Sequence, residues 1–139
     1  DINFNNILVG TKEQKAWLID FEYACRAPAE FDVAMMMAIN NVPLSWLNEI
    51  ISLYRQRTFV ILDEVLCKHL LIFSHLVNGL WYYQQPVSVK QNTNFRLLAR
   101  QQWLAFDQYY NELILQPNCS LDDTNTTMTT PNVSLAAFI

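Results

Sequence analysis

The spacing of apolar residues changes along the chain. In the first 30 residues they come in short runs between polar turns, whereas from residue 44 onward they recur at steps of three and four. Short runs bounded by turn residues are typical of strands, and steps of three and four are typical of amphipathic helices. The pattern predicts a mainly α protein with a small β-hairpin near its N-terminus.

The β-hairpin is predicted from two apolar runs with a polar turn between them. Ile7 to Val9 form the first run, 10–14 form the turn, and 15–20 resume the apolar pattern. Residues 1–6 then precede the first strand, and Asp20 ends the second. We expect the hairpin geometry to bring polar side chains of these two stretches together.

Four helices are predicted in the remainder of the chain. The first has Glu30 in its opening turn and ends before Pro43, because proline cannot continue a helix. In the second helix, Ser45 is the expected N-cap. The apolar side of this second helix is expected to form a buried stripe made of Leu47, Ile50, Ile51 and Tyr54.

The third and fourth helices are longer. The third, at about 59–85, is apolar over more than half of its circumference and stops at Pro86, so we expect it at the centre of a helical bundle. The fourth covers about 94–115. Beyond it Ser, Thr, Asn and Pro dominate, so the chain divides into one domain, 1–115, and a loose polar tail, 116–139.

Composition narrows the class of protein. With 52% hydrophobic residues and a net charge of -4, the chain fits a globular domain without a basic surface for nucleic acid or an anionic membrane. Gly10 and Gly79 are its only glycines, which excludes a Gly-rich phosphate loop. Three distant cysteines without a C-x-x-C pair predict neither a disulfide scaffold nor a zinc site. No apolar run approaches the roughly 20 residues that span a bilayer, so we expect a cytoplasmic protein.

Three oxygen-bearing residues flank the predicted hairpin: Asp1, Asn6 and Asp20. Mg²⁺ prefers oxygen ligands and is commonly held by one or two carboxylates plus substrate phosphates, so Asn6 and Asp20 could hold it while Asp1 stays free to move a proton. Asp and Asn are also common in turns for local hydrogen-bonding reasons. Taken by themselves, the three residues therefore leave a purely structural role open.

Three ordered stretches extend this pattern, namely residues 1–9 (DINFNNILV), 17–24 (WLIDFEYA) and 31–34 (FDVA). In this order and spacing they resemble the core of the choline/ethanolamine kinase and aminoglycoside phosphotransferase superfamily. The catalytic loop of these enzymes reads H-x-D-x-x-x-x-N, and their metal-binding Asp follows a hairpin in an I-D-F-E context. A weaker echo lies at 74–81. The resemblance implies the C-terminal lobe of a protein-kinase-like fold.

The resemblance implies an activity as well. Such an enzyme transfers phosphate from ATP to the hydroxyl of a small cationic alcohol, such as choline, ethanolamine or thiamine, with Mg²⁺ as cofactor. By this resemblance Asp1 would orient the hydroxyl and accept its proton. Asn6 and Asp20 would bind the Mg²⁺ that bridges the ATP phosphates.

The resemblance also assigns residues around the alcohol. Glu22 would support the metal or the cationic head of the substrate, and Tyr23 would line its pocket. Trp81 aligns with an aromatic residue that receives a quaternary ammonium by cation-π attraction, and Asn78 stands at a neighbouring position of that aromatic cage, which leaves the cage incomplete. Asp32 looks like the helix residue that hydrogen-bonds the backbone of the catalytic loop.

In this superfamily the groups that cover ATP lie upstream of the catalytic loop, and this sequence opens at Asp1. We therefore expect a fragment of a longer protein, inactive alone, with an apolar face that the N-terminal lobe covers. Two other interpretations stay open. The chain could be an inactive helical remnant or a binding module, and N-glycosylation triplets beginning at Asn118, Asn125 and Asn132 would suit a secreted glycoprotein.

Overall fold

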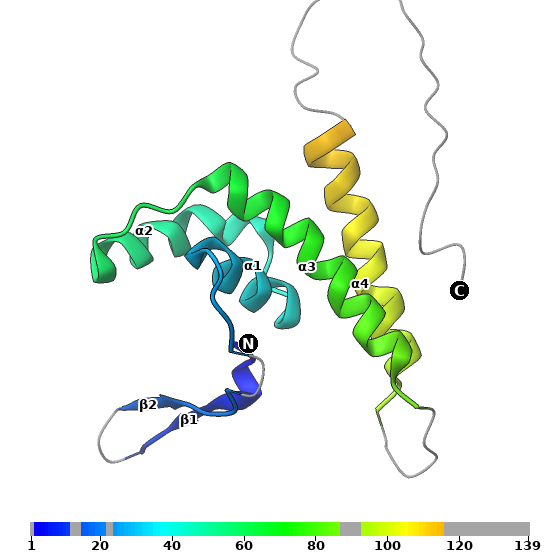
Figure 1. Ribbon diagram of the computed structural model, residues 1–139, viewed down its shortest axis with the longest axis horizontal. Helices are drawn as coiled ribbons and strands as arrows, with labels where there is room; N and C mark the ends of the chain where they lie inside the picture. Colours follow the sequence, from blue (N-terminus) through cyan, green and yellow to red (C-terminus); the bar gives the residue numbers. More distant parts are fainter. Residues whose placement is uncertain (1, 12–14, 22–23, 87–92, 116–139) are drawn as a thin grey trace, which may run out of the picture.

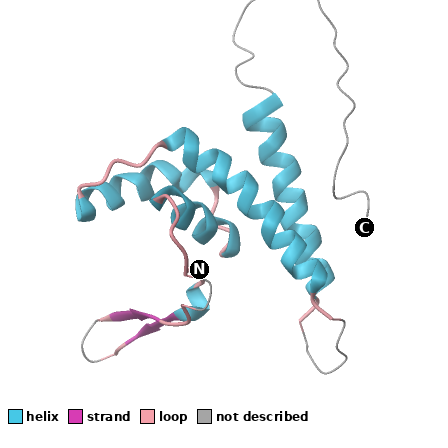
Figure 2. Ribbon diagram, in the orientation of Figure 1, coloured by secondary structure: helices cyan, strands magenta, loops and turns pink. Residues whose placement is uncertain are grey.

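The structure is a computed structural model that describes residues 2–11, 15–21, 24–86 and 93–115. Within these ranges a short β-hairpin is followed by four α-helices, and the last two helices lie side by side (Figure 1). Helix dominates the described chain (Figure 2), so the prediction of a mainly α protein with a small hairpin is confirmed. None of the helices in these ranges is long and apolar enough to cross a membrane.

The hairpin forms where the sequence predicts it. β1 (Ile7–Val9) pairs antiparallel with β2 (Ala16–Leu18). A single 3-10 turn (Phe4–Asn6) leads into β1, and the Asn3 side chain caps this turn by accepting a hydrogen bond from its backbone. The hairpin stands away from the helices (Figure 1), so its position depends on the segment that joins it to them.

α1 (Ala29–Ile39) begins and ends as the sequence predicts. Glu30 and Asp32 lie in its first turn, where carboxylates interact favourably with the positive end of the helix dipole. Asn40 follows as the C-cap, and Asn41 has a φ of 52°, a left-handed conformation that asparagine tolerates. The helix therefore stops through this asparagine pair.

α2 (Leu47–Thr58) differs from the prediction at its start. A 3-10 turn (Leu44–Trp46) precedes it, Ser45 lies exposed inside that turn, and the N-cap position has no side-chain hydrogen bond. The prediction that Ser45 is the N-cap is wrong, because Pro43 already opens the turn with its fixed φ. The predicted stripe packs against the core, with one fully buried and three partly buried members: Leu47, Ile50, Ile51 and Tyr54.

α3 (Glu64–Gln84) begins later than the predicted position 59. Phe59 instead ends α2 in a left-handed conformation and is exposed. The true start is capped by Asp63, whose carboxylate accepts hydrogen bonds of 2.8 and 3.1 Å from two backbone N–H groups of the first turn. The apolar run before α3 is therefore a loop, and it buries Leu62 in the core without being helical.

α4 (Phe95–Tyr110) and a π-helical turn (Asn111–Leu115) cover the predicted fourth helix. Asn94 caps α4 by accepting a hydrogen bond from the Leu97 backbone at 3.0 Å. α3 packs against both α1 and α4, which confirms its predicted central position. The predicted tail, 116–139, lies outside the described residues.

Close approach of α3 and α4 depends on Gly79. A Cβ atom at this position would overlap the indole of Trp103, so only glycine leaves room for that ring. Apolar residues from α1, α2, α3 and the loop before α3 form one core cluster. Its buried members are Val33, Ala34, Met37, Ala38, Leu47, Leu62, Cys67 and Leu71.

A buried polar chain also joins three helices. His75 Nδ1 on α3 lies 2.8 Å from Gln102 Oε1 on α4, and Gln102 Nε2 donates to the Ala38 carbonyl of α1 at 3.1 Å. Since that nitrogen of Gln102 is engaged, its oxygen accepts from His75, which fixes the proton on Nδ1. Burial lowers the pKa of His75, and the hydrogen bond to Gln102 opposes part of the shift.

Candidate active site

The hairpin brings the two predicted magnesium ligands to one end. Ile7 pairs with Leu18 at the end of the ladder, and just beyond it Ile19 donates its backbone N–H to the Asn6 carbonyl at 2.9 Å. Asn6 is therefore the acceptor of a backbone hydrogen bond that connects the two segments, and Asp20 directly follows its donor, Ile19. Asp20 is exposed and Asn6 is half-buried. Asp1, the predicted proton acceptor, lies outside the described residues.

Asp20 also has an unusual backbone. Its φ is 64°, in the left-handed region that residues other than glycine rarely occupy, although Asp and Asn tolerate it best. Such conformations cost free energy and cluster at functional sites. This left-handed residue lies two positions after the end of β2, at the residue that the sequence predicts as a metal ligand.

Asn40 holds the segment that precedes the hairpin. Its Oδ1 accepts from the Phe4 backbone N–H at 2.8 Å, while its Nδ2 donates to the carbonyls of Ile2 at 2.9 Å and Met36 at 2.7 Å. One side chain at the end of α1 therefore fixes the stretch that leads from Asp1 into β1. Sequence reasoning missed this residue, since its position predicts only a helix C-cap.

Asp32 was predicted to perform this supporting role. It lies exposed in the first turn of α1, and no hydrogen bond joins it to the described part of segment 2–6. Within the described ranges, Asn40 at the opposite end of α1 makes these bonds. A contact between Asp32 and Asp1 stays a prediction, because Asp1 is outside those ranges.

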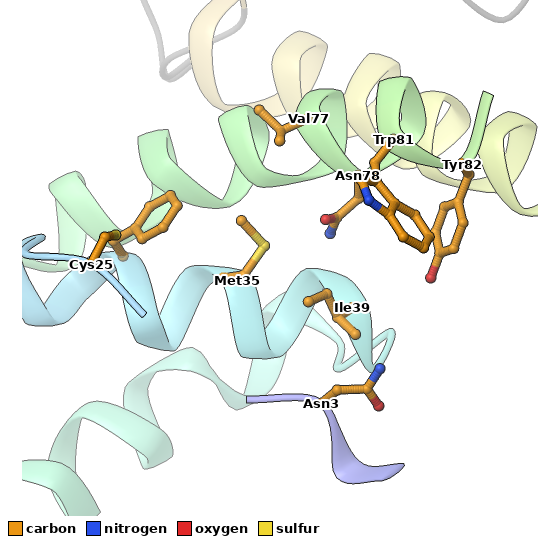
Figure 3. Close-up of a pocket in the computed structure, with 9 residues that line it drawn as sticks. Asn3, Cys25, Met35, Ile39, Val77, Asn78, Trp81 and Tyr82 are labelled. Carbon is orange, nitrogen blue, oxygen red and sulfur yellow. The ribbon is translucent and has the colours of Figure 1, made fainter. Parts of the chain in front are cut away.

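A cavity of about 380 Å³ opens between segment 2–6, the loop before α1, and helices α1 and α3. This volume lies within the range of pockets for small ligands. Figure 3 shows side chains from α1 and α3 facing each other across it. Asn3 stands at one edge, two residues after the predicted catalytic Asp1. The lining residues are Asn3, Cys25, Phe31, Met35, Ile39, Val77, Asn78, Trp81 and Tyr82.

Aromatic rings form one wall of this cavity. Trp81 is about half exposed and meets Tyr82 edge-on at a ring distance of 5.3 Å, and both rings contact Phe95 at 6.3 Å. The described lining residues include no Asp, Glu, Lys or Arg. A cation here would therefore be held by ring faces and not by a carboxylate of these residues. Glu22 and Tyr23, also predicted for this pocket, lie outside the described residues.

Asn78 gives this cavity its buried polar group. Its side chain is 9% exposed, and its Nδ2 has no hydrogen-bond partner within the part of the chain that the structure describes. Ser74 Oγ and Trp103 Nε1 are also buried without partners, but neither residue lines the cavity. Buried donors without acceptors are rare in native proteins, so the Asn78 amide is an exceptional feature of this cavity.

The described residues contain no group of three or more His, Cys, Asp and Glu side chains that could hold a metal ion. Asn6 and Asp20 together offer an amide oxygen and a carboxylate, which are ligands that suit Mg²⁺. An ion that keeps several waters and is bound through nucleotide phosphates needs only one or two such protein ligands. By residue type, an amide and a carboxylate suit that mode, and the role of Asn6 and Asp20 as Mg²⁺ ligands stays a prediction.

Comparisons of this chain with protein-family models, curated proteins and solved structures found no match. The class of the site is therefore defined by its residues alone. Among the described residues, half-buried Asn6 and exposed Asp20 lie at the end of the hairpin, and segment 2–6 connects this end to a small aromatic cavity.

Proposed function

We propose that the chain is the C-terminal lobe of a protein-kinase-like phosphotransferase that moves phosphate from ATP to the hydroxyl of a small cationic alcohol. One observation carries the proposal. Asn3, which lines the aromatic cavity, and Asn6, whose carbonyl accepts from Ile19 just before Asp20, belong to a single short segment held by Asn40. An alcohol in the cavity and a metal-bound phosphate at the hairpin would thus meet beside that segment.

Phosphate transfer of this kind requires few protein groups. Phosphate transfer passes through a loose transition state, so it is accelerated mainly by positioning and charge neutralisation. Asp1 orients the hydroxyl and takes its proton, while Asn6 and Asp20 offer oxygen ligands on the phosphate side. A bound Mg²⁺ supplies positive charge that neutralises the transferring phosphate. Glu22 and Tyr23 complete the surroundings of the alcohol in this proposal.

The proposal includes an N-terminal lobe upstream of Asp1 that covers ATP, and it places the protein in the cytoplasm. Exposed apolar side chains on the hairpin support a covering partner of this kind. Leu8, Val9 and Trp17 are between 47% and 68% exposed, although each lies in a strand. In the extended protein this apolar surface would face the cleft between the lobes.

The test is phosphate transfer by a protein extended upstream of Asp1. We expect Mg²⁺-dependent phosphorylation of at least one member of a panel of choline, ethanolamine, thiamine and aminosugars. An Asp1→Asn variant should lose about 100-fold or more of the rate, which is the usual contribution of general base catalysis. Glu49→Gln is the matched control, because it removes an exposed carboxylate on α2 that lines neither part of the site.

An alternative function is a binding module that holds a small molecule in the cavity without acting on it. The observation in its favour is that the described cavity is walled by α1 and α3 without any contribution from Asp20. The same experiment separates the two functions. Binding of an alcohol without any phosphate transfer by the extended protein would contradict the proposed activity and favour the binding module.

A further inference from the structure

The carboxamide of Asn78 is positioned to bind a ligand. It projects from α3 toward α1, close to Met35 and Ile39 (Figure 3). Its Nδ2 is buried and has no acceptor among the described residues. A donor in this state loses its hydrogen bonds to water on folding and regains none, which is unfavourable unless a bound molecule supplies the acceptor.

The surroundings of Asn78 define what that molecule looks like. One turn of α3 places Trp81 and Tyr82 on the same cavity wall, and their ring faces suit a cation. Val77 and Ile39 make the rest of this region apolar. The cavity therefore offers a cation-accepting surface and, beside it, one hydrogen-bond donor in apolar surroundings.

A simple two-carbon amino alcohol does not use all of these features. In the proposed reaction its hydroxyl must point toward Asp1, and its ammonium group has no lone pair to accept a hydrogen bond. The hydroxyl oxygen keeps lone pairs, but a hydrogen bond from Asn78 to this attacking oxygen would withdraw electron density from the nucleophile, so a different acceptor suits the reaction better. A substrate with a further oxygen or ring nitrogen can satisfy this donor.

We propose that Asn78 is a specificity-determining residue that donates a hydrogen bond from Nδ2 to an acceptor atom of the substrate. The substrate class is then a cationic alcohol that carries, in addition to its reacting hydroxyl, an uncharged acceptor such as a carbonyl oxygen, an ether oxygen or a ring nitrogen. The cation and the hydroxyl in this description rest on the proposed function. The acceptor atom rests on Asn78 alone.

The test uses two probes of equal charge and similar length, acetylcholine and pentyltrimethylammonium. Acetylcholine carries ester oxygens where the other probe has only methylene groups, and neither probe has a hydroxyl that could be phosphorylated. Binding to the purified chain is measured by calorimetry without Mg²⁺ or ATP. We expect acetylcholine to bind about tenfold more tightly, as one hydrogen bond to a buried donor predicts.

Two variants assign the preference to its residue. Asn78→Leu, of similar volume, should bring the ratio of the two affinities to about one, because it removes the donor. Trp81→Leu should weaken both probes by a similar factor and preserve the ratio, because ring faces contact the cation that both share. Far-ultraviolet circular dichroism confirms that each variant keeps its helices.

The outcomes separate this inference from the proposed function. Equal affinities of the two probes for the unmodified chain, or binding of neither probe, would overturn the role of Asn78. A preference for acetylcholine that survives Asn78→Leu would do the same. If the preference depends on Asn78 but the extended protein transfers no phosphate, the inference stands for a binding pocket and the phosphotransferase proposal fails.

Discussion

The hairpin segment and the helical body, which comprises α1 to α4, hold their residues in place by different means. No side chain in the described part of segment 2–21 is fully buried, and its geometry depends on backbone hydrogen bonds and on the clamp from Asn40. In the body, residues such as Met37 and Leu71 are completely enclosed. The comparison teaches that polar positions in the hairpin can change with little loss of stability, whereas the helices tolerate few changes in volume.

The two glycines give the sharpest contrast between these regions. Gly79→Ala should destabilise the protein by about 3 kcal/mol, because the new methyl group would overlap Trp103 between two packed helices. Gly10→Ala should change the unfolding free energy by less than about 0.5 kcal/mol, because the Cβ would crowd the exposed side chain of Trp17, which can move, and would make only an ordinary contact with the Lys15 carbonyl. Urea denaturation of both variants measures the difference. Equal effects would contradict the contrast.

Asn40 connects the two regions, so its loss should loosen one without unfolding the other. Asn40→Ala should lower the global unfolding free energy by about 1 kcal/mol and should increase hydrogen exchange of the Phe4 amide by about tenfold or more. The control is Asn48→Ala, an exposed asparagine on α2. If exchange at Phe4 is the same in both variants, Asn40 does not hold segment 2–6.

Titration of His75 should change the stability of the helical body with pH, because this histidine lies on α3. Because burial lowers the pKa of His75 from its ordinary value of 6.5, the unfolded chain takes up this proton at a higher pH than the folded chain. The contribution of neutral His75 is fully present above about pH 6.5 and is lost as the pH falls toward the folded pKa.

The measurement is the urea midpoint from about pH 7.5 to about pH 5. His75→Gln should flatten the decrease in stability toward acid pH. His69→Gln changes an exposed histidine of the same helix and should not alter the decrease in stability toward acid pH. If the urea midpoint depends on pH equally in the two variants, His75 is not the group responsible for the decrease.

The last prediction involves no change in stability. It compares the reactivity of a cysteine on the cavity wall, Cys25, with that of a cysteine in the core, Cys67. Burial raises the pKa of Cys67 to about 11, with Glu30, Asp63 and Glu64 adding to the shift, whereas Cys25 is exposed on the cavity wall. Since the thiolate is the reactive form, N-ethylmaleimide should modify Cys25 and spare Cys67 in the folded protein. A Cys119→Ser background limits the reaction to these two thiols, and peptide mass spectrometry reads the sites. Rapid modification of Cys67 would contradict its burial.

Much of the fold follows from the periodicity of the sequence. The hairpin and the ends of α1 and α4 agree with the apolar pattern, because burial of one face sets that pattern. The start of α3 does not agree with the apolar pattern. Leu62 lies in the loop before α3 and is buried, so in the sequence it extends the apolar pattern of the helix. Asp63 followed by Glu64 was a usable capping signal for the true start.

The candidate site could be predicted only in part. Motif spacing singles out Asn6 and Asp20, and the hairpin joins Asn6 to Ile19, the residue before Asp20, while their metal role stays a prediction. The contact from Asn40 joins segments 36 positions apart, and no local pattern specifies it. The proposed role of Asn78 rests on a side-chain amide that has no partner among the described residues, which only the packed structure can reveal.

The most direct test of the central claim is the rate of phosphate transfer by the upstream-extended protein and by its Asp20→Asn variant. Asparagine tolerates the left-handed backbone of this position, so the substitution removes the charge and keeps the fold. The account predicts at least about a 100-fold loss of Mg²⁺-dependent transfer, with stability unchanged. Full turnover by Asp20→Asn would contradict the assignment of the hairpin as the phosphate side of an active site.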